Sequence, residues 1–194
     1  MSPRPPTSEP GAAANAAARF SATAPADVHY AMIDSPLGPL VAARTDRGLA
    51  RLAYEGPNGG LDAVLDGLAA RLSPRILEAP ARLDDVRREL EEYFAGRRRT
   101  FDLPVDLGLV RGPFGRRVLE ATSAIPFGGV STYREIAERA GSAAAVRAAG
   151  NALGANPVPI VVPCHRVLRT GGGLGGYTGG LHVKEALLAV EGRR

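Results

Sequence analysis

Short apolar runs separated by turn-forming residues characterise the first part of the chain. The runs at residues 28–34, 41–44 and 49–55 are interrupted by the segments PLGPL and TDRG, which is typical of strands joined by tight turns. They predict an antiparallel meander of three strands. A further strand around residues 100–103 is expected to complete this small sheet.

Apolar residues recur at helical spacing in two segments of the same region, residues 61–72 and 83–94. The charged residues between the apolar ones are expected to form a solvated face rather than a catalytic site. Residues 104–112 are typical of a linker. The pattern therefore predicts an N-terminal α/β domain, an antiparallel sheet with helices, over residues 27–110.

The remaining residues, 111–194, are predicted to form a second, mostly helical domain. Thr132 and Glu135 have the spacing of a capping box, and Gly141 is expected to end the helix that they begin. Two short helices joined by a tight glycine turn predict a helix-turn-helix. The helices are expected at about residues 114–125, 132–140, 143–153 and 181–190. The fold class is therefore α/β (α+β).

The second helix of this pair, AAAVRAAGNALG, contains mainly small residues and one long cation, Arg147. A helix that reads bases in the major groove presents several hydrogen-bonding side chains. This helix is instead compatible with close approach to a sugar-phosphate wall in the minor groove. Tight packing against neighbouring helices, with Arg147 in solvent, is the alternative interpretation.

Composition adds limits on the class of protein. Apolar residues make up 45% of the 194 residues and charged residues 23%, as in soluble globular proteins. Residues 1–26 are rich in Pro, Ala and Ser and are predicted to be a disordered tail. With neither a signal peptide nor a membrane-spanning run expected, we place the protein in the cytoplasm. The formal net charge of +4 is uneven, with −2 up to Val110 and +6 from Arg111, which suits binding to a polyanion.

Cys164 is the lone cysteine, so it forms neither an internal disulfide nor a multi-cysteine zinc site. It follows an apolar run bounded by Pro159 and Pro163, and His165 is the next residue. A thiol attacks as its thiolate and therefore needs a base. His165 is the candidate, directly or through a water, and Glu185 in the predicted C-terminal helix is a candidate to orient the imidazole. The alternative is a buried, inert cysteine beside a surface histidine.

The sequence PCHRV resembles the active-site signature of the O6-alkylguanine-DNA alkyltransferases. The resemblance extends in order over most of the region from Leu83 to Gly192, through EEYFAGRRRTFDLP, IPFGGVSTYREIAERAG, AVRAAGNAL, NPVPIVVPCHRV and GGYTGGLHVKEALLAVEG. It implies repair of alkylated DNA by direct transfer of the alkyl group to Cys164, irreversibly and once per molecule. O6-methylguanine is the implied lesion, and O4-methylthymine stays open as a second one.

The resemblance also implies roles for individual residues. His165 acts as the base through a water and Glu185 completes the relay, while Asn156 braces the turn before the active-site segment. Tyr133 rotates the phosphate and donates a hydrogen bond to the guanine ring, and Arg147 fills the gap left by the flipped base. Further implied residues are Ala148 and Gly150 at the DNA, and Tyr177, Thr178, Val167 and Pro159 in the alkylguanine pocket.

The implied partner is double-stranded DNA that carries O6-alkylguanine, bound by a monomer without a membrane, a metal or a cofactor. Two other functions are compatible with parts of the sequence. A lesion-binding protein would flip alkylated bases without transfer, which an intact Cys164 argues against. A cysteine hydrolase would use Cys164 and His165 but leaves the helix-turn-helix unexplained. The glycines at 171, 173 and 176 fit a dinucleotide-binding motif, but the loop setting favours a pocket wall.

Overall fold

The three apolar runs at the start form strands, as their spacing predicted. β1 (Val28–Ile33), β2 (Leu40–Thr45) and β3 (Gly48–Tyr54) pair antiparallel in chain order. Gly48 has a φ of +133° and lies against the backbone of Pro104, where a side chain would collide. The computed structural model describes residues 27–193, so the predicted disordered tail, residues 1–26, lies outside the described residues.

The fourth strand of this sheet is not where the sequence placed it. β4 (Ile76–Glu78) pairs parallel with β1, which gives the order β3-β2-β1-β4. Residues 100–103, predicted as a strand, form none. The chain instead meets the outer edge of β3 just beyond them, where Leu49 N donates to Pro104 O (2.7 Å) and Asp106 N donates to Leu49 O (2.9 Å). Pro104 has no N–H to extend this pairing into a ladder.

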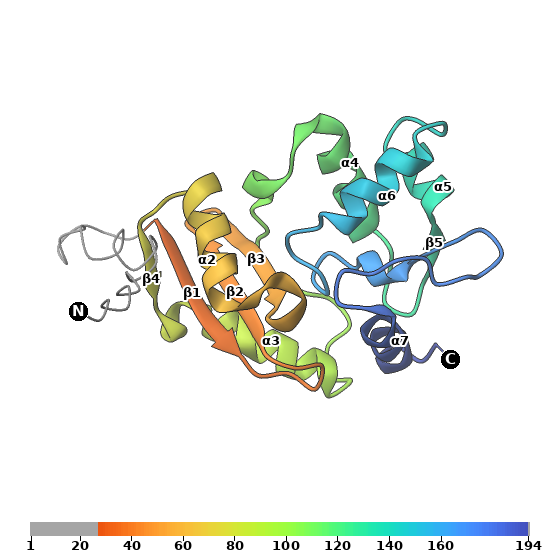
Figure 1. The fold of residues 1–194 in the computed structure, drawn as a ribbon. Helices are drawn as coiled ribbons and strands as arrows, with labels where there is room; N and C mark the ends of the chain where they lie inside the picture. The colour runs from red at the N-terminus through yellow and green to blue at the C-terminus, as the bar shows by residue number, and fades with distance from the viewer. Residues whose placement is uncertain (1–26, 194) are drawn as a thin grey trace, which may run out of the picture.

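Helices cover both faces of the sheet (Figure 1). Side chains alternate along β2, so Val41 and Ala43 pack with α2 (Gly60–Arg71), whereas Ala42 belongs to the core that includes α3 (Asp84–Phe94). Arg87 on α3 pairs with Asp84 and Glu91 at the surface, as expected of a solvated face. Short 3-10 turns lie at Gly56–Asn58 (η1), Pro80–Leu83 (η2) and Leu107–Leu109 (η3).

The second half is mostly helical, as predicted. Its helices are α4 (Gly112–Ser123), α5 (Tyr133–Arg139), α6 (Val146–Gly154) and α7 (Leu181–Val190). The capping box is confirmed, because Glu135 N donates to Thr132 Oγ1 and the Glu135 carboxylate accepts from Thr132 N. Two short strands of this half, β5 (Ser131–Thr132) and β6 (Val167–Leu168), pair in parallel.

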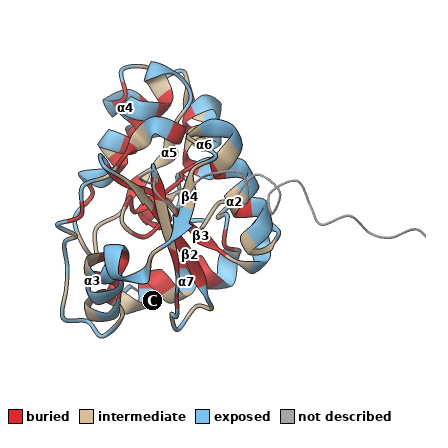
Figure 2. Ribbon diagram, turned by 90° about the vertical axis from the view of Figure 1, so that its left-hand side faces the viewer, coloured by how far each residue is buried: buried red, intermediate tan, exposed pale blue. Residues whose placement is uncertain are grey.

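One continuous core joins the two halves. Tyr54 and Tyr93 from the first half belong to the same cluster as Val158 and Leu187 from the second, and buried residues run from the sheet into the helices (Figure 2). Leu52 N in β3 also donates to Pro157 O (2.8 Å). The segment before Cys164 is therefore fixed against the sheet. Within the described range, no helix has the length and apolar character needed to cross a bilayer.

Candidate active site

Cys164 begins a single 3-10 turn, η4 (Cys164–Arg166), at the end of a tightly folded segment. Asn156 organises this segment. Its Oδ1 accepts from Val158 N (3.0 Å), and its Nδ2 donates to Val162 O (2.8 Å) and to the Cys164 sulfur (3.2 Å). Ile160, between these points, adopts a φ of 74°, which is rare for a β-branched residue. Asn156 thus holds a strained turn and the thiol together, in the place that the resemblance implied.

The Cys164 side chain is buried, with only 8% of the residue exposed. Burial raises the pKa of the thiol, and the hydrogen bond from Asn156 and the charge of Lys184 offset this only in part. At neutral pH the resting group is therefore the thiol. A reaction at its sulfur needs a nearby group to take the proton.

His165 is fully buried and contacts a carboxylate, but the carboxylate is Glu191 rather than the expected Glu185. His165 Nε2 lies 2.9 Å from Glu191 Oε1, whereas Glu185 is exposed on α7. Burial lowers the pKa of His165, and the bond to Glu191 opposes that shift only in part. Because an ionised carboxylate only accepts, Nε2 carries the ring proton. The other nitrogen, Nδ1, is buried and has no hydrogen-bond partner among the described residues.

Glu191 receives donors from several parts of the chain. Besides His165, the Arg166 guanidinium donates to both oxygens at 2.9–3.2 Å, the Tyr93 hydroxyl donates to Oε1 (2.8 Å) and Gly128 N donates to Oε2 (3.1 Å). Burial alone would raise the pKa of Glu191, but the bonds from His165 and Arg166 outweigh it and lower the pKa to about 2. The carboxylate therefore stays ionised and fixes the imidazole.

Helical spacing explains why Glu191 rather than Glu185 reaches the site. The buried residues Lys184 and Leu187 lie on the inner face of α7, and Glu191, the residue that caps this helix, follows Lys184 by seven positions on the same face. Glu185 is rotated away by one position. The seven-residue spacing is present in the sequence, but Glu191 lies one position beyond the predicted helix.

Lys184 is a second residue whose importance the sequence analysis missed. It is the single lysine among 24 cationic residues, and it is fully buried. Its Nζ donates to the carbonyls of Val167 (2.6 Å) and Leu174. Burial lowers the pKa of Lys184 to about 8, although the neighbouring Cys164 opposes that shift. A positive charge is thus held near the thiol, and the loop that contains Leu174 is tied to the core.

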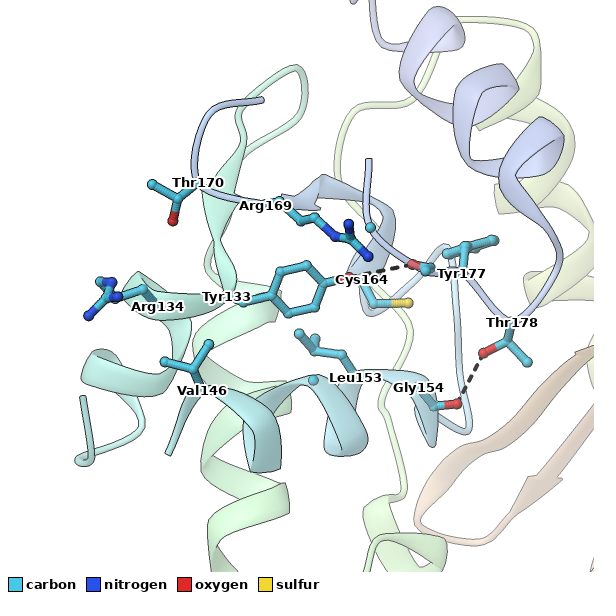
Figure 3. A pocket seen from close by; sticks show the side chains of 13 residues that line it. Tyr133, Arg134, Val146, Leu153, Gly154, Cys164, Arg169, Thr170, Tyr177 and Thr178 are labelled. Atoms are coloured by element: carbon cyan, nitrogen blue, oxygen red, sulfur yellow. Dashed lines mark hydrogen bonds between the residues drawn. The ribbon is translucent and has the colours of Figure 1, made fainter. Parts of the chain in front are cut away.

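A cavity of about 550 Å³ opens above Cys164 between α6 and the loop that follows β6. Figure 3 shows Tyr133, Val146 and Leu153 on the helical side and Arg169 and Tyr177 on the loop side. Thr178 also lines it and donates from Oγ1 to Gly154 O (3.0 Å). The cavity thus brings Tyr133, Tyr177 and Thr178 together around the thiol.

Two expected pocket residues are not part of this lining. Val167 is fully buried in β6, where its carbonyl accepts from Lys184. Pro159 is also buried and forms an isolated β-bridge with Val162 in the segment before Cys164. Both residues are buried in the core and do not reach the cavity wall. Val146, Leu153 and Arg169 line the cavity instead and were not predicted.

The α6 helix has one packed and one open side. Ala149 and Leu153 are buried, while Arg147 and Ala148 are exposed. Gly150 lies at the cavity, where an added Cβ would lie 3.8 Å from the Tyr133 ring. The small residues of α6 are therefore compatible with both interpretations. They pack closely against the neighbouring helices on one side, and on the other side they leave a surface with one cation that DNA could approach. Among residues 27–193, no group of three or more His, Cys, Asp or Glu side chains has the arrangement of a metal site.

Comparisons with known proteins match both halves of the chain. Residues 28–107 match the family model "6-O-methylguanine DNA methyltransferase, ribonuclease-like domain", and residues 113–193 match "6-O-methylguanine DNA methyltransferase, DNA binding domain". A methylated-DNA–protein-cysteine methyltransferase of Mycobacterium tuberculosis is 39% identical over 86% of this chain and 94% of its own length. The constitutive protein of that name from Bacillus subtilis is 36% identical, covering 84% and 94%.

Solved structures give the same result. The crystal structure of Mycobacterium tuberculosis O6-methylguanine methyltransferase aligns with a TM-score of 0.72 at 38% identity, covering 84% of this chain and 92% of that one. A second structure, Mycobacterium tuberculosis OGT in complex with DNA, aligns with a TM-score of 0.71 at the same identity and coverage. The similarity thus spans the sheet, the helix-turn-helix and the segment that carries Cys164.

Proposed function

This chain belongs to the methylated-DNA–protein-cysteine methyltransferases, DNA-repair enzymes that transfer an alkyl group from DNA to a protein cysteine, and we propose that its acceptor is Cys164. The proposed substrate is O6-alkylguanine in double-stranded DNA, with O4-methylthymine as a second lesion to be tested. The proposed acting form is a cytoplasmic monomer that reacts once. A lone thiol at the floor of a cavity beside the helix-turn-helix is the observation that supports this proposal most strongly.

The alkylated base must leave the duplex to reach Cys164, because the sulfur is buried at the base of the cavity. The open side of α6 would approach the DNA backbone closely, since its exposed residues other than Arg147 and Asn151 are small. Arg147 is the one long cation on that helix and would occupy the space left in the base stack. Base extrusion costs a few kcal/mol and is easier where alkylation has already weakened pairing.

The proton of the thiol would move to His165 before or during attack. Nδ1 is the free nitrogen of the ring, and one water between it and the sulfur would carry the proton. Glu191 holds the opposite N–H, so the imidazolium that forms is stabilised by an ionised carboxylate. The low pKa that burial gives to His165 suits this role, because the imidazole is neutral and able to accept at neutral pH.

Sulfur would then displace guanine from the alkyl carbon. The S–C bond forms while the C–O6 bond breaks, and the electron pair of that bond leaves with guanine. The Tyr133 hydroxyl, which points into the cavity (Figure 3), would donate to the guanine ring and stabilise the developing anion. Guanine takes up a proton from solvent and His165 returns its proton there. The product on Cys164 is a thioether without a hydrolytic route back, so each molecule reacts once.

The test of this proposal follows the DNA. A duplex with a single O6-methylguanine is incubated with the protein, and the bases are separated after digestion. We expect one guanine restored per protein molecule, and none with Cys164→Ala, which should still bind the duplex. Restoration of many guanines per molecule would contradict the proposal, as would full activity of the Cys164→Ala variant.

A further inference from the structure

Two tyrosines of the N-terminal half reach into the active site of the C-terminal half. The chain has five tyrosines. Tyr133 and Tyr177 line the cavity, and Tyr54 and Tyr93 each place a hydroxyl on a residue of the site. Tyr30, on β1, is the remaining one. Four of the five therefore gather at the site although two of them come from the sheet domain.

The Tyr93 hydroxyl shares an acceptor with the catalytic imidazole. Tyr93 lies on α3 and is fully buried, with its ring against Phe94, Phe101 and Phe127. Its hydroxyl donates to Glu191 Oε1 at 2.8 Å, the same oxygen that accepts from His165 Nε2 at 2.9 Å. Donors that share an oxygen divide its negative charge, so Tyr93 weakens the pull of Glu191 on the His165 proton.

The Tyr54 hydroxyl contacts the loop side of the cavity, across from the proton relay. Tyr54 ends β3 and is 4% exposed. Its oxygen lies 3.1 Å from the Tyr177 hydroxyl, and the two rings meet edge to face with centroids 6.2 Å apart. A side chain at Gly179 would come within 2.8 Å of the Tyr54 ring. The loop between β6 and α7 is thus seated directly on the sheet domain.

The aromatic rings of Tyr54 and Tyr93 would pack equally well as phenylalanine rings, so packing does not explain why both residues carry a hydroxyl group. A buried hydroxyl destabilises the fold unless it is hydrogen-bonded, and phenylalanine would avoid that penalty. Burial raises the pKa of Tyr54, Tyr93 and Tyr177, so all three remain protonated and act as hydrogen-bonding groups, not as bases.

We propose that Tyr93 and Tyr54 are positioning residues through which the N-terminal domain sets the two sides of the active site. Tyr93 keeps His165 neutral and ready to accept the thiol proton by sharing Glu191. Tyr54 holds Tyr177 and thereby the shape of the base pocket. This inference rests on the proposed alkyl transfer to Cys164. The sheet domain would then contribute directly to the geometry of the active site.

The two tyrosines are expected to give different signatures. The titratable and charged groups that act on the His165–Glu191 pair are Tyr93 from α3, Arg166 from η4 and Lys184 from α7. Lys184, with a pKa of about 8, stays cationic below neutral pH, and Glu191, with a pKa of about 2, stays ionised, so a change between these values reports on His165. Tyr93→Phe should raise the His165 pKa and so slow transfer about threefold to tenfold at a given pH on the acid limb, with little change at neutral pH, where the imidazole is already neutral. Tyr54→Phe should leave that pKa unchanged.

The experiment compares wild type, Tyr93→Phe, Tyr54→Phe and the control Tyr30→Phe. Single-turnover transfer from a methylated duplex is followed against pH, and the rate with free O6-benzylguanine is followed against its concentration. We expect the acid limb to move to higher pH in Tyr93→Phe alone. We expect the concentration for half-maximal rate to rise about threefold to tenfold in Tyr54→Phe alone. Tyr30→Phe should match wild type in both.

Neither the limb midpoint nor the half-maximal concentration depends on the fraction of active protein, so a loss of folded material does not mimic these shifts. An unchanged midpoint in Tyr93→Phe or an unchanged half-maximal concentration in Tyr54→Phe would overturn that half of the inference. The His165 ring titration, followed by NMR, reads the Tyr93 effect without any reaction. Failure of wild type to transfer at all would instead contradict the proposed function, and the NMR shift would still decide the role of Tyr93.

Discussion

The two sides of the active site are built in opposite ways. On the side of the proton relay, His165, Arg166 and Glu191 are buried, and donors from α3 and from the main chain at Gly128 complete their hydrogen bonds. On the side of the cavity, the loop at residues 169–178 is mostly exposed and rich in glycine. Individual side-chain hydrogen bonds hold that loop, among them Thr178 to Gly154, Lys184 to Leu174 and Tyr54 to Tyr177.

This difference separates two requirements of one reaction. Proton transfer needs groups whose positions are fixed before the substrate arrives, because reorganising charges during the reaction would raise its barrier. Admission of a flipped base needs a wall with little local stability. Glycines at positive φ, such as Gly171 and Gly175, allow the loop to take its course without side chains that would narrow the entrance. Changes to the relay should therefore have large effects, and changes to the loop should have small, substrate-dependent ones.

Glu191→Gln should have the largest effect. The neutral amide cannot stabilise the His165 imidazolium, and it leaves the buried Arg166 without its carboxylate. We expect single-turnover transfer to slow about a hundredfold or more and the free energy of unfolding to fall by about 3 kcal/mol. Quenched single-turnover assays measure the rate of transfer, and chemical denaturation measures the free energy of unfolding.

The exposed Glu185 provides the matched control. Glu185→Gln should keep the rate and the stability of wild type, and equal losses in the two variants would remove the distinction between the buried and exposed acids. The two variants should also differ in how their stability depends on pH. Because folding lowers the pKa of Glu191 from 4.5 to about 2, its contribution is present above pH 4.5 and is lost as the pH falls toward 2. Glu191→Gln should lack that acid-dependent loss.

Arg147→Ala should separate base extrusion from chemistry. Duplex repair is expected to slow about tenfold or more, because the gap in the stack is no longer filled. The rate of reaction with free O6-benzylguanine should stay within about twofold of wild type. The slope of DNA affinity against salt concentration should hardly change. Arg139→Ala, an exposed cation at the end of α5, is the control. Equal slowing on both substrates would show that Arg147 supports the pocket or the fold.

Lys184→Met should give an intermediate effect that depends on pH. Folding lowers the pKa of Lys184 to about 8, so its charge helps the thiolate below that pH and fades above it. We expect wild-type transfer to decline on the alkaline side of about pH 8. The variant should be slower by about threefold to tenfold at neutral pH and should lack this decline. An alkaline limb that persists in the variant would assign the limb to another group.

Thr178→Ser should give the smallest effect. Thr178 lines the cavity and its hydroxyl donates to Gly154, a bond that serine preserves. Removal of one methyl group should speed reaction with O6-benzylguanine by about threefold relative to O6-methylguanine. The ratio of the two single-turnover rates measures this effect. An unchanged ratio would mean that the methyl group does not limit the room for bulky alkyl groups.

Local pattern was sufficient where neighbouring residues determine the structure. The capping box at Thr132 and Glu135 and the bounds of α7 follow from spacing within a few residues. Cys164, His165 and Asn156 are adjacent to the same turn, and the structure brings them together as a motif of that length allows.

Long-range pairing was beyond those patterns. β4 has three residues and is a strand because β1 lies beside it, and nothing in its own composition distinguishes it from residues 100–103. Glu191 lies 26 positions after His165, and its partner Tyr93 comes from another domain. The role of each is set by which elements pack together, so the relay could be completed only when the fold was known.

Intact-protein mass after reaction with an excess of O6-methylguanine duplex tests the central claim most directly. The proposal predicts a gain of one methyl group per molecule, located by peptide mapping on Cys164, with no further gain as incubation continues. An unmodified protein that has nevertheless repaired the DNA would contradict the proposal, as would a methyl group located on any other residue.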